Sequence, residues 1–94
     1  MANVIILVSV INNKVTVSLN PALVTINDTV IFKPDTGVTI NSITENQGSN
    51  NVFSTLPTSP NWTGTISSNA QGKAEKYTIK ANGLSHDPKI EVKP

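Results

Sequence analysis

The sequence contains no cysteine, and histidine, methionine and tryptophan each occur only once. The absence of cysteine excludes disulfide bonds, thiolate metal ligands and cysteine nucleophiles. Small secreted domains often depend on disulfides, so we favour a cytoplasmic location. The first lysine, Lys14, follows the apolar run of residues 4–10, whereas a signal peptide carries positive charge before such a run. We therefore expect no signal peptide.

Charged side chains are also few, with seven basic and six acidic residues and a net charge of +1. Basic residues this scarce and this widely spread predict no nucleic-acid-binding surface. They also provide no basic amphipathic segment for a membrane surface. The apolar run of residues 4–10 is too short for a transmembrane helix. It is typical of a strand that is buried on both faces.

The residues that are abundant favour β-structure. Valine, isoleucine and threonine form short alternating segments, which suit a pleated and half-buried surface, and turn-forming residues separate them. No segment keeps a period of 3.6 residues. The length is that of one domain, residues 1–94, and we predict an all-β sandwich of seven or eight strands. The expected strands are residues 3–11, 14–19, 23–26, 29–33, 38–43, 63–68, 73–80 and 89–93.

The middle of the chain interrupts this pattern. Residues 44–63 form a polar stretch that contains Phe53, Leu56 and Trp62. A loop of this length is uncommon in a compact domain and often carries function. The alternative is that its large apolar side chains close the open end of the sandwich and hold the loop in place by packing.

Two segments carry a family resemblance. Residues 22–32 read ALVTINDTVIF, in which Asn27-Asp28 joins two strands, and residues 77–94 read YTIKANGLSHDPKIEVKP. Both resemble segments of the cupredoxins, the blue-copper proteins and their relatives, with Asn27 where the family has glycine. This resemblance implies a Greek-key sandwich with cupredoxin-like strand order, and an immunoglobulin-like order is the alternative.

A second resemblance rests on the end of the chain. Asp87-Pro88 leads into the last expected strand, and residues 91–94 end it. These residues are similar to those of the DP-EP family, a group of small bacterial proteins of unknown function. The resemblance implies a short sandwich that stands alone, and it adds no activity.

The cupredoxin resemblance implies a copper site whose ligands this chain lacks. The family's cysteine position falls on Ala81, the loop that follows holds only His86, and residues 38–46 contain no histidine. A blue-copper site needs a thiolate and two imidazoles, so we expect no cofactor. The remaining metal hypothesis is a looser zinc or copper site formed by His86 with Asp87 and Asp35.

Residues of catalytic type also occur without a catalytic arrangement. Ser85, His86 and Asp87 are consecutive, and consecutive extended residues point to opposite sides, so we expect turn chemistry and no triad. We expect the six acids at turns or at outward strand positions beside lysines, as for Glu75 and Glu91. We therefore predict that the chain is not an enzyme.

The function predicted from these observations is a non-enzymatic binding or assembly module. Its surface would combine residues 46–51, Phe53 and Trp62 with Leu84 and His86, because loops gather at the ends of a sandwich. A protein, a peptide, a carbohydrate or a second copy of the chain would each suit this surface as a partner. Two alternatives remain: a degenerate metal-binding or redox relative of the cupredoxins, and a structural subunit that self-assembles through an edge strand.

Overall fold

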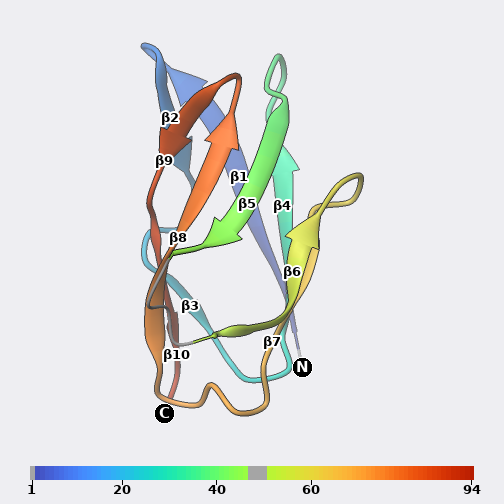
Figure 1. Cartoon of the computed structure of the whole chain (residues 1–94), viewed down its shortest axis with the longest axis vertical. Helices are drawn as coiled ribbons and strands as arrows, with labels where there is room; N and C mark the ends of the chain where they lie inside the picture. The colour runs from blue at the N-terminus through green and yellow to red at the C-terminus, as the bar shows by residue number, and fades with distance from the viewer. Residues whose placement is uncertain (1, 47–50) are drawn as a thin grey trace.

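In residues 2–46 and 51–94, which the computed structural model describes, the chain forms ten β-strands and no helix (Figure 1). The strands are β1 (Asn3–Ile11), β2 (Lys14–Val17), β3 (Ala22–Val24), β4 (Thr29–Pro34), β5 (Ile40–Glu45), β6 (Phe53–Thr58), β7 (Thr63–Ile66), β8 (Ala74–Ala81), β9 (Leu84–His86) and β10 (Lys89–Val92). The all-β prediction is confirmed. Two strands exceed the predicted seven or eight: β6 lies in the segment predicted as a loop, and β9 lies in the predicted C-terminal loop.

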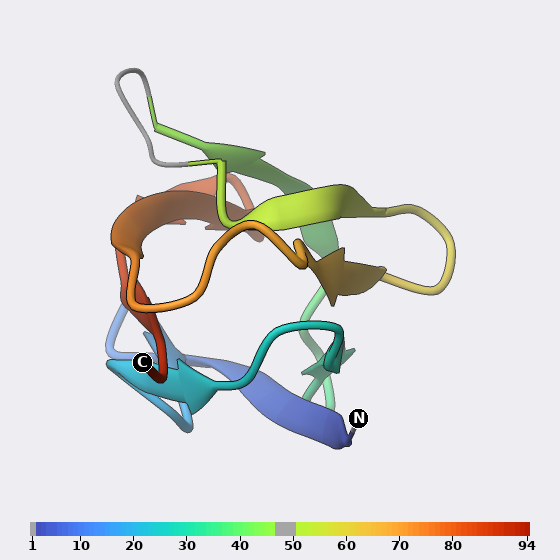
Figure 2. The same ribbon diagram turned by 90° about the horizontal axis from the view of Figure 1, so that it is seen from below.

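The strands form two sheets that enclose a common interior (Figure 2). The first sheet has the order β2-β1-β4-β7-β6 and the second has the order β3-β10-β8-β5, with β9 also paired to β8. Most neighbours are antiparallel, but β1 pairs with β4 in parallel and β3 pairs with β10 in parallel. Both β1 and β10 lie between two neighbours. Strand β10 pairs with β3 on one side and with β8 on the other, so edge-to-edge pairing through the last strand is not available. Strand β1 pairs with β4 over Asn3–Val8 and with β2 over Val8–Ile11.

The core forms because one side of each strand is apolar. Phe32 of β4 and Tyr77 of β8 meet edge to face, with ring centroids 5.5 Å apart and an angle of 67° between the rings. Burying one large apolar side chain contributes about 1.5–3 kcal/mol, so these inward positions dominate the stability of the sandwich. The other large side chains that are fully buried include Ile6, Val8, Val24, Val30, Val52, Ile66, Ile79 and Ile90.

Strand β1 differs from its predicted burial. Ile6 and Val8 face the core and have no exposed surface, whereas Ile5 and Leu7 are 54% and 40% exposed. The prediction that this strand is buried on both faces is therefore wrong for the single chain. The sequence pattern is that of a covered strand, but within the described residues only its inner face is covered.

Two hairpin turns explain the tight connections of the sheets. Asn12 and Asn13 join β1 to β2 with φ values of 53° and 62°, and Asn82 and Gly83 join β8 to β9 with φ values of 49° and 76°. Two-residue turns with positive φ match the twist of antiparallel strands, and asparagine and glycine adopt them most readily. The turn predicted at Asn12-Asn13 is confirmed.

Two carboxylates are buried. Asp28 is 4% exposed and accepts hydrogen bonds from the backbone N–H groups of Ala2 and Thr25, at 2.9 and 2.8 Å. Glu75 is 6% exposed, and its Oε1 accepts a hydrogen bond from the N–H of Val52 at 3.1 Å. The prediction of an outward Glu75 beside lysines is therefore wrong, because the side chain occupies an inward position of β8 and binds the chain entering β6.

Candidate functional site

The end of the sandwich at the β4–β5 loop and the β8–β9 turn is closed by Asn82 (top of Figure 1). The N–H of Asn82 donates to the carbonyl of Thr39 at 3.0 Å, and the N–H of Thr39 donates back to Asn82 Oδ1 at 2.8 Å. Asn82 Nδ2 donates to the carbonyl of Gly37 at 3.3 Å. The N–H of Gly83 donates to Asn41 Oδ1 at 2.9 Å. These hydrogen bonds use polar groups of the two loops that could otherwise bind a ligand at this end of the sandwich.

The residues considered as metal ligands do not come together. Ala81, at the cysteine position implied by the resemblance, is fully buried, and His86 belongs to β9. The Asp87 carboxylate accepts a hydrogen bond from Thr78 Oγ1 at 2.8 Å, and Asp35 accepts one from Ser9 Oγ at 3.3 Å. Across residues 2–46 and 51–94, no group of three or more His, Cys, Asp or Glu side chains is placed to hold a metal.

The Ser85-His86-Asp87 sequence also lacks the arrangement of a triad. Ser85 is exposed and His86 is half-buried, as expected for neighbours on opposite faces of a strand. A triad needs the base between the nucleophile and the acid, within hydrogen-bond reach of both. The Asp87 carboxylate instead accepts its hydrogen bond from Thr78.

The first surface groove lies between the neighbouring strands β2 and β9 and has a volume of about 520 Å³. We call it the β2–β9 groove. Leu84 and His86 both line it, whereas Phe53 and Trp62, which were predicted to share their surface, do not. Most of the remaining lining comes from the β1–β2 hairpin, far away in the sequence, and was not predicted. The lining residues are Asn13, Lys14, Val15, Thr16, Val17, Asn20, Leu84, Ser85 and His86.

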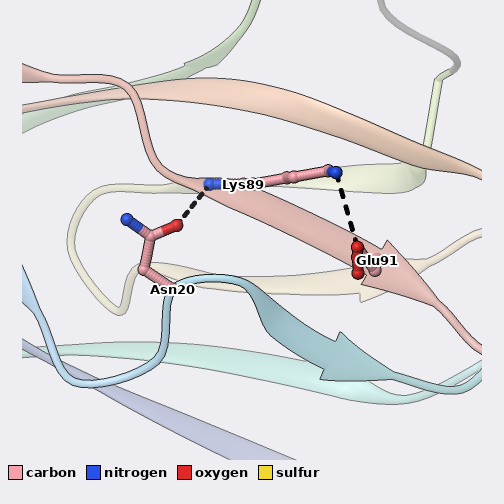
Figure 3. A network of polar contacts seen from close by, with 3 residues as sticks. All are labelled: Asn20, Lys89 and Glu91. Carbon is pink, nitrogen blue, oxygen red and sulfur yellow. Dashed lines mark hydrogen bonds and ion pairs between the residues drawn. The ribbon is translucent and has the colours of Figure 1, made fainter.

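One border of this groove is held by a polar network (Figure 3). Asn20 Oδ1 accepts a hydrogen bond from the N–H of Lys89 at 3.0 Å, between residues that are 69 positions apart. The Nζ of Lys89 lies 3.4 Å from Glu91 Oε1 in a surface ion pair. The pairing of Lys89 with Glu91 agrees with the predicted solvent-facing position of this acid. The Asn20–Lys89 hydrogen bond fixes the β2–β3 connection against β10, whereas the ion pair lies within β10.

The second surface groove lies between the β4–β5 loop and the β6–β7 turn and has a volume of about 540 Å³. We call it the Trp62 groove. It shares no lining residue with the β2–β9 groove, so Trp62 lies apart from Leu84 and His86. Its lining combines two aromatic side chains and two prolines with amide and hydroxyl groups. The lining residues are Ile31, Phe32, Lys33, Pro34, Val38, Thr39, Ile40, Ser59, Pro60, Asn61 and Trp62.

Trp62 has an unusual backbone conformation for a bulky residue. Its φ is +49°, in the left-handed region that glycine and asparagine favour. Two backbone hydrogen bonds hold it there: its N–H donates to the carbonyl of Thr58 at 2.8 Å, and its carbonyl accepts from the N–H of Phe32 at 2.9 Å. The indole is half-buried, packs against the core and lines the groove.

Phe53 has a structural position. It is the first residue of β6 and is 6% exposed, and its N–H donates to Glu45 Oε2 at 3.4 Å. Leu56 is partly buried against the same core. These two positions agree with the packing alternative for the central stretch. Of the predicted binding segment 46–51, residues 47–50 lie outside the described residues.

No known protein family matches the sequence, and no characterised protein is detectably similar to it. None of the described residues forms a helix long and apolar enough to cross a membrane. The resemblances to cupredoxins and to the DP-EP family therefore stay predictions, and any functional hypothesis depends on the two grooves and the outer faces of the sheets.

Proposed function

We propose that the chain is a non-enzymatic binding module and that the Trp62 groove is its binding site. The observation that carries this proposal is the conformation of Trp62, a half-buried tryptophan at positive φ beside a groove. A bulky residue in this region costs about 1–3 kcal/mol, and such strain gathers at ligand sites. Two backbone hydrogen bonds hold the residue in place, so the indole is pre-organised.

The lining favours a neutral ligand that has both apolar faces and hydroxyl groups. The indole of Trp62 and the rings of Pro34 and Pro60 offer flat apolar surface, and Asn61 and Ser59 offer hydrogen-bonding groups. Among the described residues that line the groove there is no carboxylate, and Lys33 alone is charged. A neutral oligosaccharide fits this chemistry best. A peptide or protein partner is the alternative outcome of the test.

The test uses the fact that Trp62 is the only tryptophan of the chain. A ligand in the groove should shift its fluorescence, so titration with neutral cello-, malto-, manno- and chito-oligosaccharides should give a saturable change. We expect Asn61→Ala to weaken binding about tenfold, corresponding to about 1.4 kcal/mol, with the fold unchanged. Leu84→Ala, in the other groove, is the matched control and should bind as the parent does.

Two outcomes would contradict the proposal. One is an unchanged Trp62 emission with every oligosaccharide. The other is a fluorescence change that is equal in the parent and in Asn61→Ala. Alanine substitution of Trp62 and of Phe53 separates packing from binding. If both variants unfold, both residues are core elements, and the binding role of Trp62 must be judged from Asn61→Ala alone.

We also propose a cupredoxin-like strand order in preference to the immunoglobulin-like alternative. The parallel pairs β1–β4 and β3–β10 support this choice, because the immunoglobulin sandwich is built from two antiparallel sheets. The proposal concerns architecture alone. It assigns neither copper nor electron transfer to the chain.

A further inference from the structure

The β8–β9 turn holds the one asparagine of the sequence that precedes a glycine, in the pair Asn82-Gly83. An asparagine in this position can lose its side-chain amide without an enzyme. The backbone nitrogen of the next residue attacks the side-chain carbonyl carbon, and glycine hinders this attack least because it has no Cβ. Both residues are exposed, so water reaches the turn.

The reaction at Asn82 has two steps, and its only co-reactant is water. In the first step a bond forms between the Gly83 nitrogen and Cγ of Asn82, the Cγ–Nδ2 bond breaks, and ammonia leaves with the proton of the Gly83 nitrogen. In the second step water opens the resulting cyclic imide at one of its two carbonyls. One opening gives aspartate, and the other gives isoaspartate, in which the main chain runs through the side-chain carbon.

The fold engages both reacting groups in other contacts. The Gly83 N–H, whose nitrogen would attack, donates to Asn41 Oδ1 at 2.9 Å. Asn82 Oδ1 accepts from the N–H of Thr39 at 2.8 Å, and Asn82 Nδ2 donates to the carbonyl of Gly37 at 3.3 Å. We call these three hydrogen bonds the Asn82 clamp. Attack requires the Gly83 nitrogen to lose its proton and to meet the carbonyl carbon in an aligned geometry, and the clamp opposes both requirements.

We infer that Asn82 is a deamidation site that the Asn82 clamp keeps unreactive in the folded chain and that reacts when this end of the sandwich opens. Exposed turns open locally far more often than a whole domain unfolds. All the residues that form the clamp are exposed, so this opening leaves the core intact. The site therefore records local opening of the β8–β9 turn.

The products prevent the clamp from closing as before. Aspartate replaces the Nδ2 donor with a carboxylate oxygen, which repels the carbonyl of Gly37. Isoaspartate adds one carbon to the main chain, which disturbs a two-residue turn between paired strands. Thr39 also lines the Trp62 groove, so the modification loosens one wall of that groove. This last consequence rests on the proposed function, whereas the deamidation itself does not.

Incubation at mildly alkaline pH, followed by peptide mapping with mass spectrometry, tests the inference without any oligosaccharide. We expect Asn82 to convert about 100-fold more slowly in the folded parent than in the urea-unfolded parent, because three hydrogen bonds that each make opening about fivefold rarer act together. Asn41→Ala removes the acceptor of the Gly83 N–H, so the folded variant should convert about fivefold faster than the folded parent.

Thr44→Ala is the matched control. Thr44 is also exposed and lies on the same strand, β5, and within the described residues its side chain makes no hydrogen bond. This variant should convert as slowly as the folded parent, and all three proteins should convert at the same rate in urea.

Either of two results would overturn the inference. One is a folded parent in which Asn82 converts as fast as in the unfolded chain. The other is a folded Asn41→Ala that converts no faster than Thr44→Ala. If Asn41→Ala does not fold, hydrogen exchange of the parent decides. Exchange and deamidation both require release of the Gly83 N–H, so urea below the unfolding transition should accelerate both in proportion. Faster exchange with an unchanged rate at Asn82 would overturn the inference as well.

Discussion

At the scale of single residues, Tyr77 places a polar hydroxyl group in the core of the sandwich. It is fully buried, and within the described part of the structure its hydroxyl has no hydrogen-bond partner. A buried polar group without a partner costs about 1–3 kcal/mol. We therefore expect Tyr77→Phe to leave stability at neutral pH unchanged or to raise it by about 1 kcal/mol. Urea unfolding of both proteins measures the difference, with equal m-values as the control.

The same residue predicts a pH dependence. Burial raises the pKa of the Tyr77 hydroxyl above its usual value of 10.0, because the charged form loses its hydration. The folded state therefore favours the protonated hydroxyl. The part of the folding stability that depends on this protonation is complete below about pH 10 and is lost as the pH rises further. The parent should lose more stability than Tyr77→Phe above pH 10. Parallel losses in the two proteins would show that ionisation of Tyr77 is not coupled to unfolding.

At the scale of the elements, the Asn82-Gly83 turn holds one end of the sandwich. The Asn82 side chain bonds the backbone of Thr39 and Gly37 across to the β4–β5 loop. Asn82→Ala should remove both bonds and destabilise the fold by about 1–3 kcal/mol. Asn12→Ala is the matched control, because Asn12 has a similar φ of 53° in the other hairpin turn. Within the described residues the Asn12 side chain makes no hydrogen bond, so Asn12→Ala loses only the free energy of placing alanine at a positive φ.

Thermal or urea unfolding of the two alanine variants separates the contribution of the Asn82 side-chain hydrogen bonds from the cost of a positive φ in the turn. A larger loss for Asn82→Ala than for Asn12→Ala is the expected result. Equal losses would show that positive φ alone explains the asparagine at position 82. Asn82→Asp should recover part of the difference, since an oxygen stays available to the N–H of Thr39 at the observed 2.8 Å.

Elements with clean alternation were predictable, and those without it were not. Alternation placed most of β2 and β8 correctly, because the inward residues other than Glu75 bury apolar surface and the outward residues meet water. Strand β6 was missed because the pairing shifts register twice along it and Pro57 lies within it. A bulged strand has no regular period for the sequence to display.

The candidate sites divide in the same way. Leu84 and His86 were predicted to share a surface, and both line the β2–β9 groove. The Val15–Val17 side of that groove was missed, because no local pattern reports which strand lies beside β9. Trp62 was identified by its residue type, but its positive φ and its separation from His86 come from long-range contacts with β4. The sequence indicated which residue types could bind a ligand, but it did not indicate which distant segments lie side by side.

At the scale of the whole molecule, the two outer faces have different chemistry. The first sheet presents threonines and the exposed side chains of Ile5 and Leu7, with Lys33 beside Leu7, and the second presents lysines with Glu91. The near-neutral net charge of +1 conceals this division, because composition averages over both faces.

Native mass spectrometry with added copper and zinc tests the remaining metal hypothesis on the intact chain. A tight site of this kind needs several donors around one point, and His86 has no such neighbours in the described structure. We therefore expect no stoichiometric metal in the parent and an identical spectrum for His86→Ala. One metal per chain that is lost in His86→Ala would contradict this and would make the β2–β9 groove a metal site. The same spectra count the copies of the chain, and a metal-free result would leave the Trp62 groove as the proposed site.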